Sequence, residues 1–237
     1  MANPPKRFFR TASVADGNSV VLDGRPLRTP KRAAMAVPSE ALAAAIADEW
    51  NALGERIEPQ ALPLTRLANT AIDGVSVART AVIDDLARYA ASDLLCYRAE
   101  GPAGLVARQT AAWDPWLRWA DETFGARLSV TRGLMPVTQP PEAIRALSLA
   151  AGPFDAFGLA ALHVAAGLTG SLVIALAVAH ERLTGAEAWA AATVDDAWQQ
   201  SQWGADCEAA ERAKALEASL VHAARFLSLL GTSQKSA

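Results

Sequence analysis

The sequence contains few residues that build covalent or metal-bound frameworks. Only two cysteines occur among its 237 residues, Cys96 and Cys207, and they form no CxxC pair. This spacing argues against a disulfide framework and suits two separate thiols in a reducing compartment. The three histidines, His163, His180 and His222, form no HExxH motif and no pair four residues apart. The sequence therefore supports no zinc site.

A strong net charge is also lacking. The formal net charge is −3, and charged residues make up 20% of the chain. Because no strong field of one sign is present, we expect neither nucleic acid nor an anionic membrane surface as a partner. The first eight residues hold no apolar signal-peptide core and no long Arg- and Ser-rich leader. We therefore expect a cytoplasmic protein or one already processed.

The common signatures of enzymes are missing as well. The chain has no GxxxxGK[ST] phosphate loop, no GxGxxG dinucleotide motif and no GxSxG nucleophile elbow. Cys96 could be a nucleophile, but no activating cation or histidine is evident beside it, which favours an inert buried thiol. We predict no catalytic residue, no cofactor and no metal ion.

One long apolar stretch, Ala156 to Ala179, stands out against this background. About twenty consecutive apolar residues can span a bilayer as a helix, so a membrane span is one interpretation. The stretch is rich in Ala and Gly, contains His163, and is interrupted at residues 167–171, where Thr169 could cap a second helix. We therefore predict two buried helices and no stable membrane insertion.

The N-terminal third has the pattern of a small antiparallel sheet. Short apolar runs are separated by the turns Asp16-Gly17-Asn18 and Asp23-Gly24. An Asp-Gly pair between such runs is a strong hairpin signal, because glycine accepts the positive φ of tight turns. Four basic side chains in this region could bind a phosphate or an acidic partner, or could protect strand edges. They are Arg25, Arg28, Lys31 and Arg32.

A helix follows the predicted sheet. Ser39 is the expected N-cap, and apolar residues recur at helical spacing with Trp50 on the buried face. Pro59 and Pro63 then interrupt regular structure. We predict an α+β protein with an N-terminal β-rich domain with one helix (residues 1–62) and a larger all-helical C-terminal domain (63–237).

Several helices are predicted in the second domain. Two cover residues 65–73 and 78–91, and another, residues 105–124, carries Trp113, Trp116 and Trp119, which could pack in the core or form an interface. A further helix is expected from Glu142 to Ala150. The last helix begins near its N-cap Asp206, and its packing stripe consists of Leu216, Leu220, Ala223, Leu227 and Leu230.

The most distinctive predicted helix runs from residue 184 to residue 204. Thr184 and Glu187 form a capping box, which explains Glu187 without a function. Trp189, Asp196 and Trp203 are seven residues apart, so they fall on one stripe of a continuous helix.

Two adjacent acids, Asp195 and Asp196, lie in this helix. Neighbouring helix residues point about 100° apart, so the pair cannot act as a catalytic dyad on one bond. Two interpretations remain: a solvated Asp195 with Asp196 paired to an arginine, or a recognition face. In the latter, indoles supply contact area and carboxylates select charge, with Gln199 and Gln202 extending the polar strip.

Five blocks of the chain, taken in order, carry a joint signal: LDGRPLRTP at 22–30, ALPLTRLANTAID at 61–73, SDLLCYRA at 92–99, FGLAALHVAAGLTGSLVIALA from 157 and WAAATVDDAWQQSQWG from 189. Together they resemble the F-type ATP synthase assembly chaperones that handle the α subunit. The resemblance covers nearly the whole chain. Such a match is more specific than any single motif.

The resemblance implies a chaperone without enzymatic activity. It would bind the free F₁ α subunit, shield the surface that later meets β, and be released on assembly. A bacterial cytoplasmic member is implied, or a mitochondrial matrix protein if the source is a eukaryote, and we expect a monomer when it is free. The alternatives are a small-molecule-binding enzyme and a membrane-associated protein. Motivated by the family and the helix geometry, we predict α-subunit contacts at Asp195, Asp196, Trp198, Gln199, Gln202 and Trp203, with Glu187 a weaker candidate.

Overall fold

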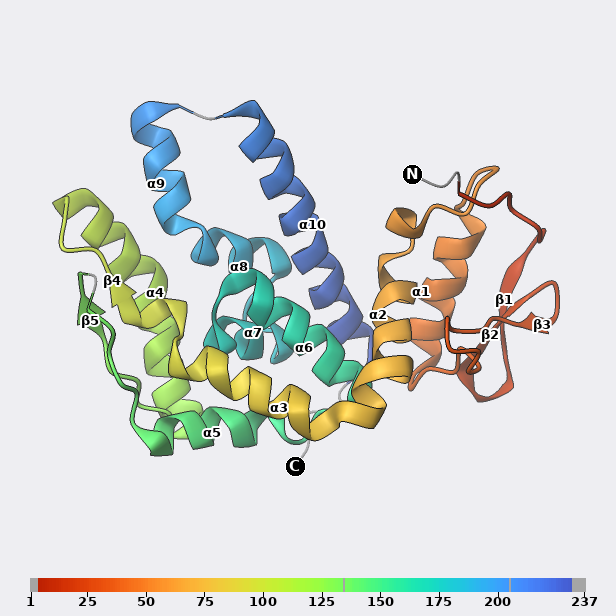
Figure 1. Ribbon diagram of the computed structural model, residues 1–237, viewed down its shortest axis with the longest axis horizontal. Helices are drawn as coiled ribbons and strands as arrows, with labels where there is room; N and C mark the ends of the chain where they lie inside the picture. Colours follow the sequence, from red (N-terminus) through yellow and green to blue (C-terminus); the bar gives the residue numbers. More distant parts are fainter. Residues whose placement is uncertain (1–3, 134, 205, 232–237) are drawn as a thin grey trace. The chain divides into compact units, whose positions relative to one another are not determined.

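The computed structural model describes residues 4–133, 135–204 and 206–231 (Figure 1). Short antiparallel strands are followed by a mostly helical region, which confirms the predicted α+β class. The chain forms two compact units. One comprises Met1–Arg79, Phe154–Ala161 and Arg225–Ala237, and the other comprises Thr80–Pro153 and Leu162–Ala224. The predicted division at residue 62 stays a prediction.

The first unit contains the predicted antiparallel sheet. Strands β1 (Ala12–Ala15), β2 (Ser19–Leu22) and β3 (Arg25–Pro26) lie in sequence order, and Ala12 pairs with Leu22. The second turn consists of Asp23 and Gly24, with φ of 47° and 77°. Positive φ at both positions suits the right-handed twist of a two-residue hairpin, so the Asp-Gly signal is confirmed.

Helix α1 (Glu40–Asn51) supports this sheet. Ser39 caps it as predicted, because its hydroxyl accepts a hydrogen bond from the Leu42 amide at 3.1 Å. The indole of Trp50 is buried, which confirms its predicted core position, and donates to the Thr65 hydroxyl at 3.0 Å. The Glu49 carboxylate accepts from the Leu64 amide at 2.7 Å. These bonds tie α1 to the next helix.

Helix α2 (Pro63–Thr70) continues into α3 (Ser76–Ala91) through one π-helical turn, Ala71–Val75. Two separate helices were predicted here, and the gap between them is helical in the structure. Ala78 departs from helical geometry, with φ of −125°, and marks a kink. Pro63 occupies the first turn of α2, where its missing N–H has no intrahelical partner to lose.

The second unit contains the long helix α4 (Ala103–Phe124) and helix α5 (Pro141–Ala151). Pro115 lies inside α4, and the helix continues past it to Phe124. Two short strands, β4 (Tyr97–Arg98) and β5 (Thr131–Arg132), pair in parallel in the same unit. An ion pair joins β4 to α4, because the carboxylate of Asp114 lies 2.8 Å from the guanidinium of the buried Arg98.

The apolar stretch forms two helices, as predicted: α6 (Ala156–Thr169) and α7 (Leu172–Ala179). All eight residues of α7 are buried, and this helix packs against α4, α5 and the following helix α8. Its cap is Ser171, whose hydroxyl accepts from the Ile174 amide at 3.0 Å, so the prediction of Thr169 is wrong. The Thr169 hydroxyl donates to the Ala165 carbonyl within α6.

In the described part of the chain, no helix combines the length and the apolar character needed to cross a membrane.

The last helix, α10 (Cys207–Leu229), is packed only in its second half. Asp206 lies at its start as predicted, and its carboxylate accepts from the Glu208 amide at 3.0 Å. Leu220 is the first buried residue of the helix. The predicted packing stripe is therefore wrong at Leu216, which is 40% exposed, because no described element covers the first turns of α10.

Candidate partner-binding surface

The predicted helix of residues 184–204 is in fact two helices. Helix α8 (Gly185–Ala192) begins with the predicted Thr184–Glu187 capping box, and α9 (Val194–Trp203) follows after a break at Thr193. The Thr193 hydroxyl donates to the Trp189 carbonyl at 2.8 Å. A β-branched residue that bonds to its own preceding turn ends α8, and two acids then favour the N-terminus of a new helix.

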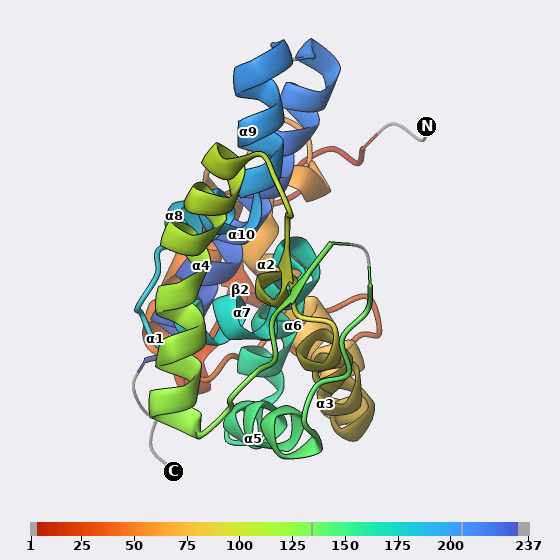
Figure 2. The same ribbon diagram turned by 90° about the vertical axis from the view of Figure 1, so that its left-hand side faces the viewer.

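One face of α9 packs on the first half of α4 (Figure 2). The side chain of Gln109, which is 1% exposed, donates to the Asp195 carboxylate at 2.7 Å and accepts from the Ala99 amide at 2.9 Å. Asp195 therefore has a structural role, because its carboxylate accepts a hydrogen bond from a buried amide. The interpretation of Asp195 as a solvated acid is wrong.

Trp198 lies on the same face of α9. Its ring covers Gly104, where an added Cβ would lie 2.6 Å from the indole carbon Cη2. The guanidinium of Arg108 lies 4.8 Å from the centre of the Trp198 ring, within the range of a cation–π contact. Glycine at position 104 thus permits the close approach of α9 to α4.

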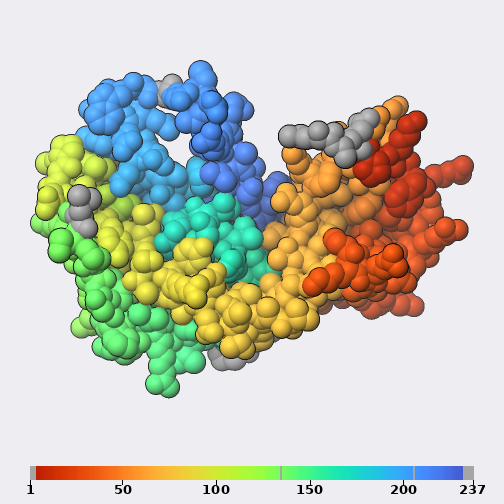
Figure 3. Space-filling model, viewed as in Figure 1, coloured from red at the N-terminus to blue at the C-terminus, as the bar shows by residue number. Residues whose placement is uncertain are grey.

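The other face of α9 borders a hollow of about 520 Å³ shared with the first turns of α10. Figure 3 shows this hollow between the two blue lobes of the C-terminal helices. Asp196, Gln199 and Trp203 line it from α9, and Trp189 contributes from α8. The α10 wall carries the small side chains of Ala209 and Ala213. The break at Thr193 is compatible with the predicted grouping of Trp189, Asp196 and Trp203, since all three line this hollow.

The residues around this hollow are largely open to solvent. Trp203 is 79% exposed, and Val194 is the one buried residue of α9. On the α10 side of the hollow, every residue from Cys207 to Ser219 is exposed or half-buried. An apolar surface rimmed by polar groups and left open to solvent is typical of a protein-binding site.

The electrostatics of the hollow are one-sided. Asp196 and Asp206 line it, whereas no Lys or Arg does so among the residues that the structure describes. The nearby cations of α10, Arg212 and Lys214, already pair with Glu208 and Glu211. Asp196 forms no ion pair within the described chain, which contradicts the interpretation that an arginine of the fold neutralises it.

Two further predicted contact residues lie outside the hollow. Gln202 is exposed, and its amide donates to the Ser201 hydroxyl at 3.2 Å. Glu187 is exposed and accepts from the Thr184 amide at 2.8 Å, and these bonds lower its pKa. The structure thus groups Asp196, Gln199 and Trp203 on one surface, and places Asp195 and Trp198 on another.

The remaining wall of the hollow was not predicted. Sequence analysis did not identify Ala209, Ala213 or Thr193 as neighbours of the acidic stripe. Alanines four residues apart place small side chains on one face of α10, which lets another element approach closely. The spacing does not indicate which element that is.

The tryptophan cluster of α4 serves packing. Trp113 is 1% exposed and its indole N–H donates to the Ala191 carbonyl at 2.7 Å, which joins α4 to α8. Trp116 and Trp119 are half-buried and meet edge to face, with ring centres 6.3 Å apart. Trp119 also meets the ring of His180 at 5.9 Å. The first tryptophan is therefore core, and the other two continue an aromatic layer.

The Cys96 thiol and the His163 imidazole are both engaged by the surrounding fold. Cys96 is buried, and burial raises the pKa of its thiol to about 12, so it stays protonated and is a poor nucleophile. His163 is half-buried and lies 2.6 Å from the Asp85 carboxylate. Within the described ranges, no three His, Cys, Asp or Glu side chains gather as a metal site.

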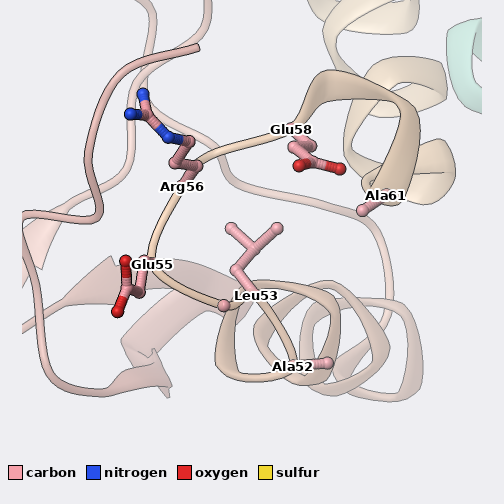
Figure 4. Close-up of a pocket in the computed structure, with 7 residues that line it drawn as sticks. Ala52, Leu53, Glu55, Arg56, Glu58 and Ala61 are labelled. Carbon is pink, nitrogen blue, oxygen red and sulfur yellow. The ribbon is translucent and has the colours of Figure 1, made fainter.

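A separate hollow of about 420 Å³ follows α1 (Figure 4). Leu53, Glu55 and Glu58 line it, while the side chain of Arg56 is directed away from Glu58. The Arg56 guanidinium donates to the Pro4 carbonyl at 2.8 Å, which fixes the N-terminal segment.

Comparisons with known proteins agree with this architecture. The model of the family described as ATP12 chaperone protein matches residues 6–121. The crystal structure of Atp12 from Paracoccus denitrificans has a TM-score of 0.90 and 41% identity, with 95% of this chain and 98% of that chain covered. This chain belongs to the ATP12 chaperone family.

Two further solved structures extend the comparison. An aspartate-to-lysine mutant of P. denitrificans Atp12p shares 40% identity, with a TM-score of 0.90 and coverage of 95% and 98%. Atu1473, a candidate chaperone of Agrobacterium tumefaciens, shares 45% identity at a TM-score of 0.89, with 95% of this chain and 85% of that chain covered. Membership of the ATP12 family supports a role in the assembly of ATP synthase.

Proposed function

We propose that this protein binds the unassembled α subunit of the F₁ part of ATP synthase. It shields the surface of α that later meets β, and it releases α when the two subunits assemble. The observation that supports this proposal best is the open hollow between α9 and α10. Trp203, which is 79% exposed, lines this hollow together with Asp196, which has no ion pair among the described residues.

The hollow suits a segment of protein more than a small molecule. Its walls combine two indoles and three alanines with carboxylate and amide groups, and it is continuous with the exposed and half-buried first turns of α10. Indole rings supply a large contact area at a small cost in side-chain entropy, which is why they dominate many binding hot spots. An assembly chaperone needs such a surface, because it must replace the contacts that its client will later make with another subunit.

The charge of the hollow indicates the chemistry of the segment. Asp196 and Asp206 present carboxylates, and Trp203 presents an indole face. A lysine or arginine side chain satisfies both, since its charged end pairs with a carboxylate and its stem or plane packs on an aromatic ring. We therefore propose that α contributes a basic side chain flanked by apolar residues. Gln199 offers an amide group to its backbone within the hollow, and the exposed Gln202 offers a second one outside it.

Asp195 and Trp198 have a different role in this proposal. Their contacts with Gln109 and Gly104 hold α9 against α4. They would influence α binding by positioning Asp196 and Trp203 and would not touch the client. Glu187, engaged in its capping box, stays a weaker candidate.

The proposed activity requires no chemical step. Binding and release at equilibrium need only a difference in affinity between the free and the assembled α subunit. We accordingly propose a protein without enzymatic activity, cofactor or metal, which is monomeric when free. The proposed location is the bacterial cytoplasm, or the mitochondrial matrix in a eukaryote.

Affinity capture from native extract tests this function. The tagged protein should recover α without β, and Asp196→Lys should lower the recovery of α about tenfold or more, because it places a cation opposite the client's cation. Glu142→Lys is a matched control, since Glu142 is an exposed acid on α5, in the same unit but outside the hollow. Unchanged recovery with Asp196→Lys would refute the role of the hollow, and failure of the wild type to recover α would refute the function.

A further inference from the structure

The N-terminal unit contains a second hollow, of about 650 Å³, lined by Phe8, Phe9 and the β2–β3 hairpin. Phe9, Leu22, Leu27 and Trp50 line it, and each is less than 9% exposed. The rings of Phe9 and Trp50 lie 5.5 Å apart and form part of an aromatic wall. At its rim stands Phe8, which is 75% exposed.

The exposure of Phe8 is not the result of a loosely held segment. The neighbouring Arg7 amide donates to the Glu55 carbonyl at 2.8 Å, and the Arg7 guanidinium donates to the Arg10 carbonyl at 2.8 Å. The same guanidinium lies 4.5 Å from the centre of the Phe9 ring. Bonds on both sides therefore fix the backbone of Phe8. Phe8 meets Phe9 edge to face and leaves most of its ring in water.

The rim also carries positive charge. Arg25 and Arg28 line the hollow, and both are exposed. Neither forms an ion pair with an acid within the described ranges. Asp23 is the one acid of the lining, and its carboxylate is occupied, because it accepts from the Arg10 amide at 3.0 Å and the Thr11 amide at 2.9 Å.

We propose that this hollow binds an extended, acidic segment of a client polypeptide. The segment buries one aromatic or branched apolar side chain against Phe9 and Trp50, packs on Phe8, and pairs a carboxylate with Arg25 and Arg28. Charge complementarity selects the sign of the segment, and the apolar wall requires a side chain that a simple anion lacks. This inference uses residues separate from the α9–α10 hollow, and it goes beyond the proposed function.

The roles of the basic residues are consequently distinct. Arg28 keeps its position through a bond from its guanidinium to the Arg32 carbonyl at 2.9 Å. Lys31 is used within the fold, since its ammonium donates to the Asp73 carbonyl at 2.7 Å. Of the four basic side chains found in this part of the sequence, Arg25 and Arg28 are therefore the pair assigned to the segment.

A titration followed by amide chemical shifts of the full chain tests the proposal. The probe is a blocked peptide, Glu-Phe-Glu-Leu-Asp, and its partner peptide has lysine at every acidic position. The acidic peptide should shift amides around Phe8 and Leu27 and bind about tenfold more tightly than the lysine peptide. Phe8→Ser and Arg25→Glu should each weaken the acidic peptide about tenfold, whereas Phe8→Leu and Arg25→Lys should retain most of the binding.

Matched controls separate this result from general changes in surface. Leu149→Ser removes another exposed apolar side chain, and Arg145→Glu reverses another exposed cation, both on α5 of the other unit. Both should bind the peptide as the wild type does. Unfolding midpoints equal to that of the wild type show that the rim variants are folded.

Four results would overturn the proposal. One is equal binding of the acidic and lysine peptides, and the second is binding that Phe8→Ser and Arg25→Glu leave unchanged. The third is that inorganic phosphate causes the same chemical-shift changes at the same concentration as the acidic peptide. That result would mean that the site binds anions in general and that its apolar wall does not contribute to binding. A dimer in sedimentation that Phe8→Ser abolishes would assign the hollow to a second copy of this chain and would also refute the proposal.

Discussion

The buried amide of Gln109 provides a sharp test of how the partner surface is held. We predict that Gln109→Leu destabilises the protein and weakens client binding, although Gln109 lies outside the hollow. The substitution keeps a similar volume but removes both polar atoms. It leaves the Ala99 amide without its acceptor at 2.9 Å and the Asp195 carboxylate without its donor at 2.7 Å.

The expected size follows from these two bonds. A half-buried amide that loses its acceptor costs about 1–2 kcal/mol, and a carboxylate that loses a donor costs about the same, since water partly replaces it at Asp195. Burial of the additional apolar surface of leucine stabilises the folded protein by about 1 kcal/mol and offsets part of this loss. We therefore expect the free energy of unfolding to fall by about 2 kcal/mol.

Urea unfolding at neutral pH measures this change. The control is Gln200→Leu, which alters an exposed glutamine of α9 and should change stability by less than about 0.5 kcal/mol. A double-mutant cycle with Asp195→Asn should show strong non-additivity, because both variants break the same bond. Strict additivity, or a stability of Gln109→Leu equal to that of the wild type, would refute this account of the α4–α9 contact.

Two further predictions concern the second unit. Gly185→Ala should lower the free energy of unfolding by about 2 kcal/mol in thermal melts, because its Cβ would lie 2.6 Å from the Val221 Cα and force α8 away from α10; an unchanged melt would contradict this. Burial raises the pKa of Asp93 to about 6 from 3.8, so its native carboxyl gives up its proton later than the unfolded one. The stability of the wild type relative to Asp93→Asn should therefore fall by about 2 kcal/mol as the pH rises from about 4 to 7, and a pH-independent difference would refute it.

Features set by neighbouring residues were predictable from the sequence. The Asp23-Gly24 hairpin, the Ser39 cap and the Thr184–Glu187 capping box all occur where the pattern placed them. Each depends on atoms within three or four residues of one another, so the sequence specifies both partners. The burial of the apolar helices also followed from composition. A helix that is apolar on every side has no face suited to water, and all eight residues of α7 are indeed buried.

Features set by distant residues were not predictable in this way. Helix geometry correctly indicated that Asp195 and Asp196 point in different directions, but it did not indicate which one faces the fold. That choice depends on Gln109, 86 positions away. The break at Thr193 was missed because the three alanines before it are strong helix formers and the residues after it continue the helical spacing. The α10 wall was missed because packing decides which element it faces.

The two faces of α9 have a consequence for how such a protein can diversify. The side that meets α4 is constrained by a buried amide and by a ring in contact with glycine, so few substitutions there keep the helix in place. The side that borders the hollow has no such obligation to the fold. Drift at Asp196, Gln199 and Trp203 can therefore follow changes in a client's surface at little cost in stability, and a chaperone and its subunit can co-evolve through one side of a single helix.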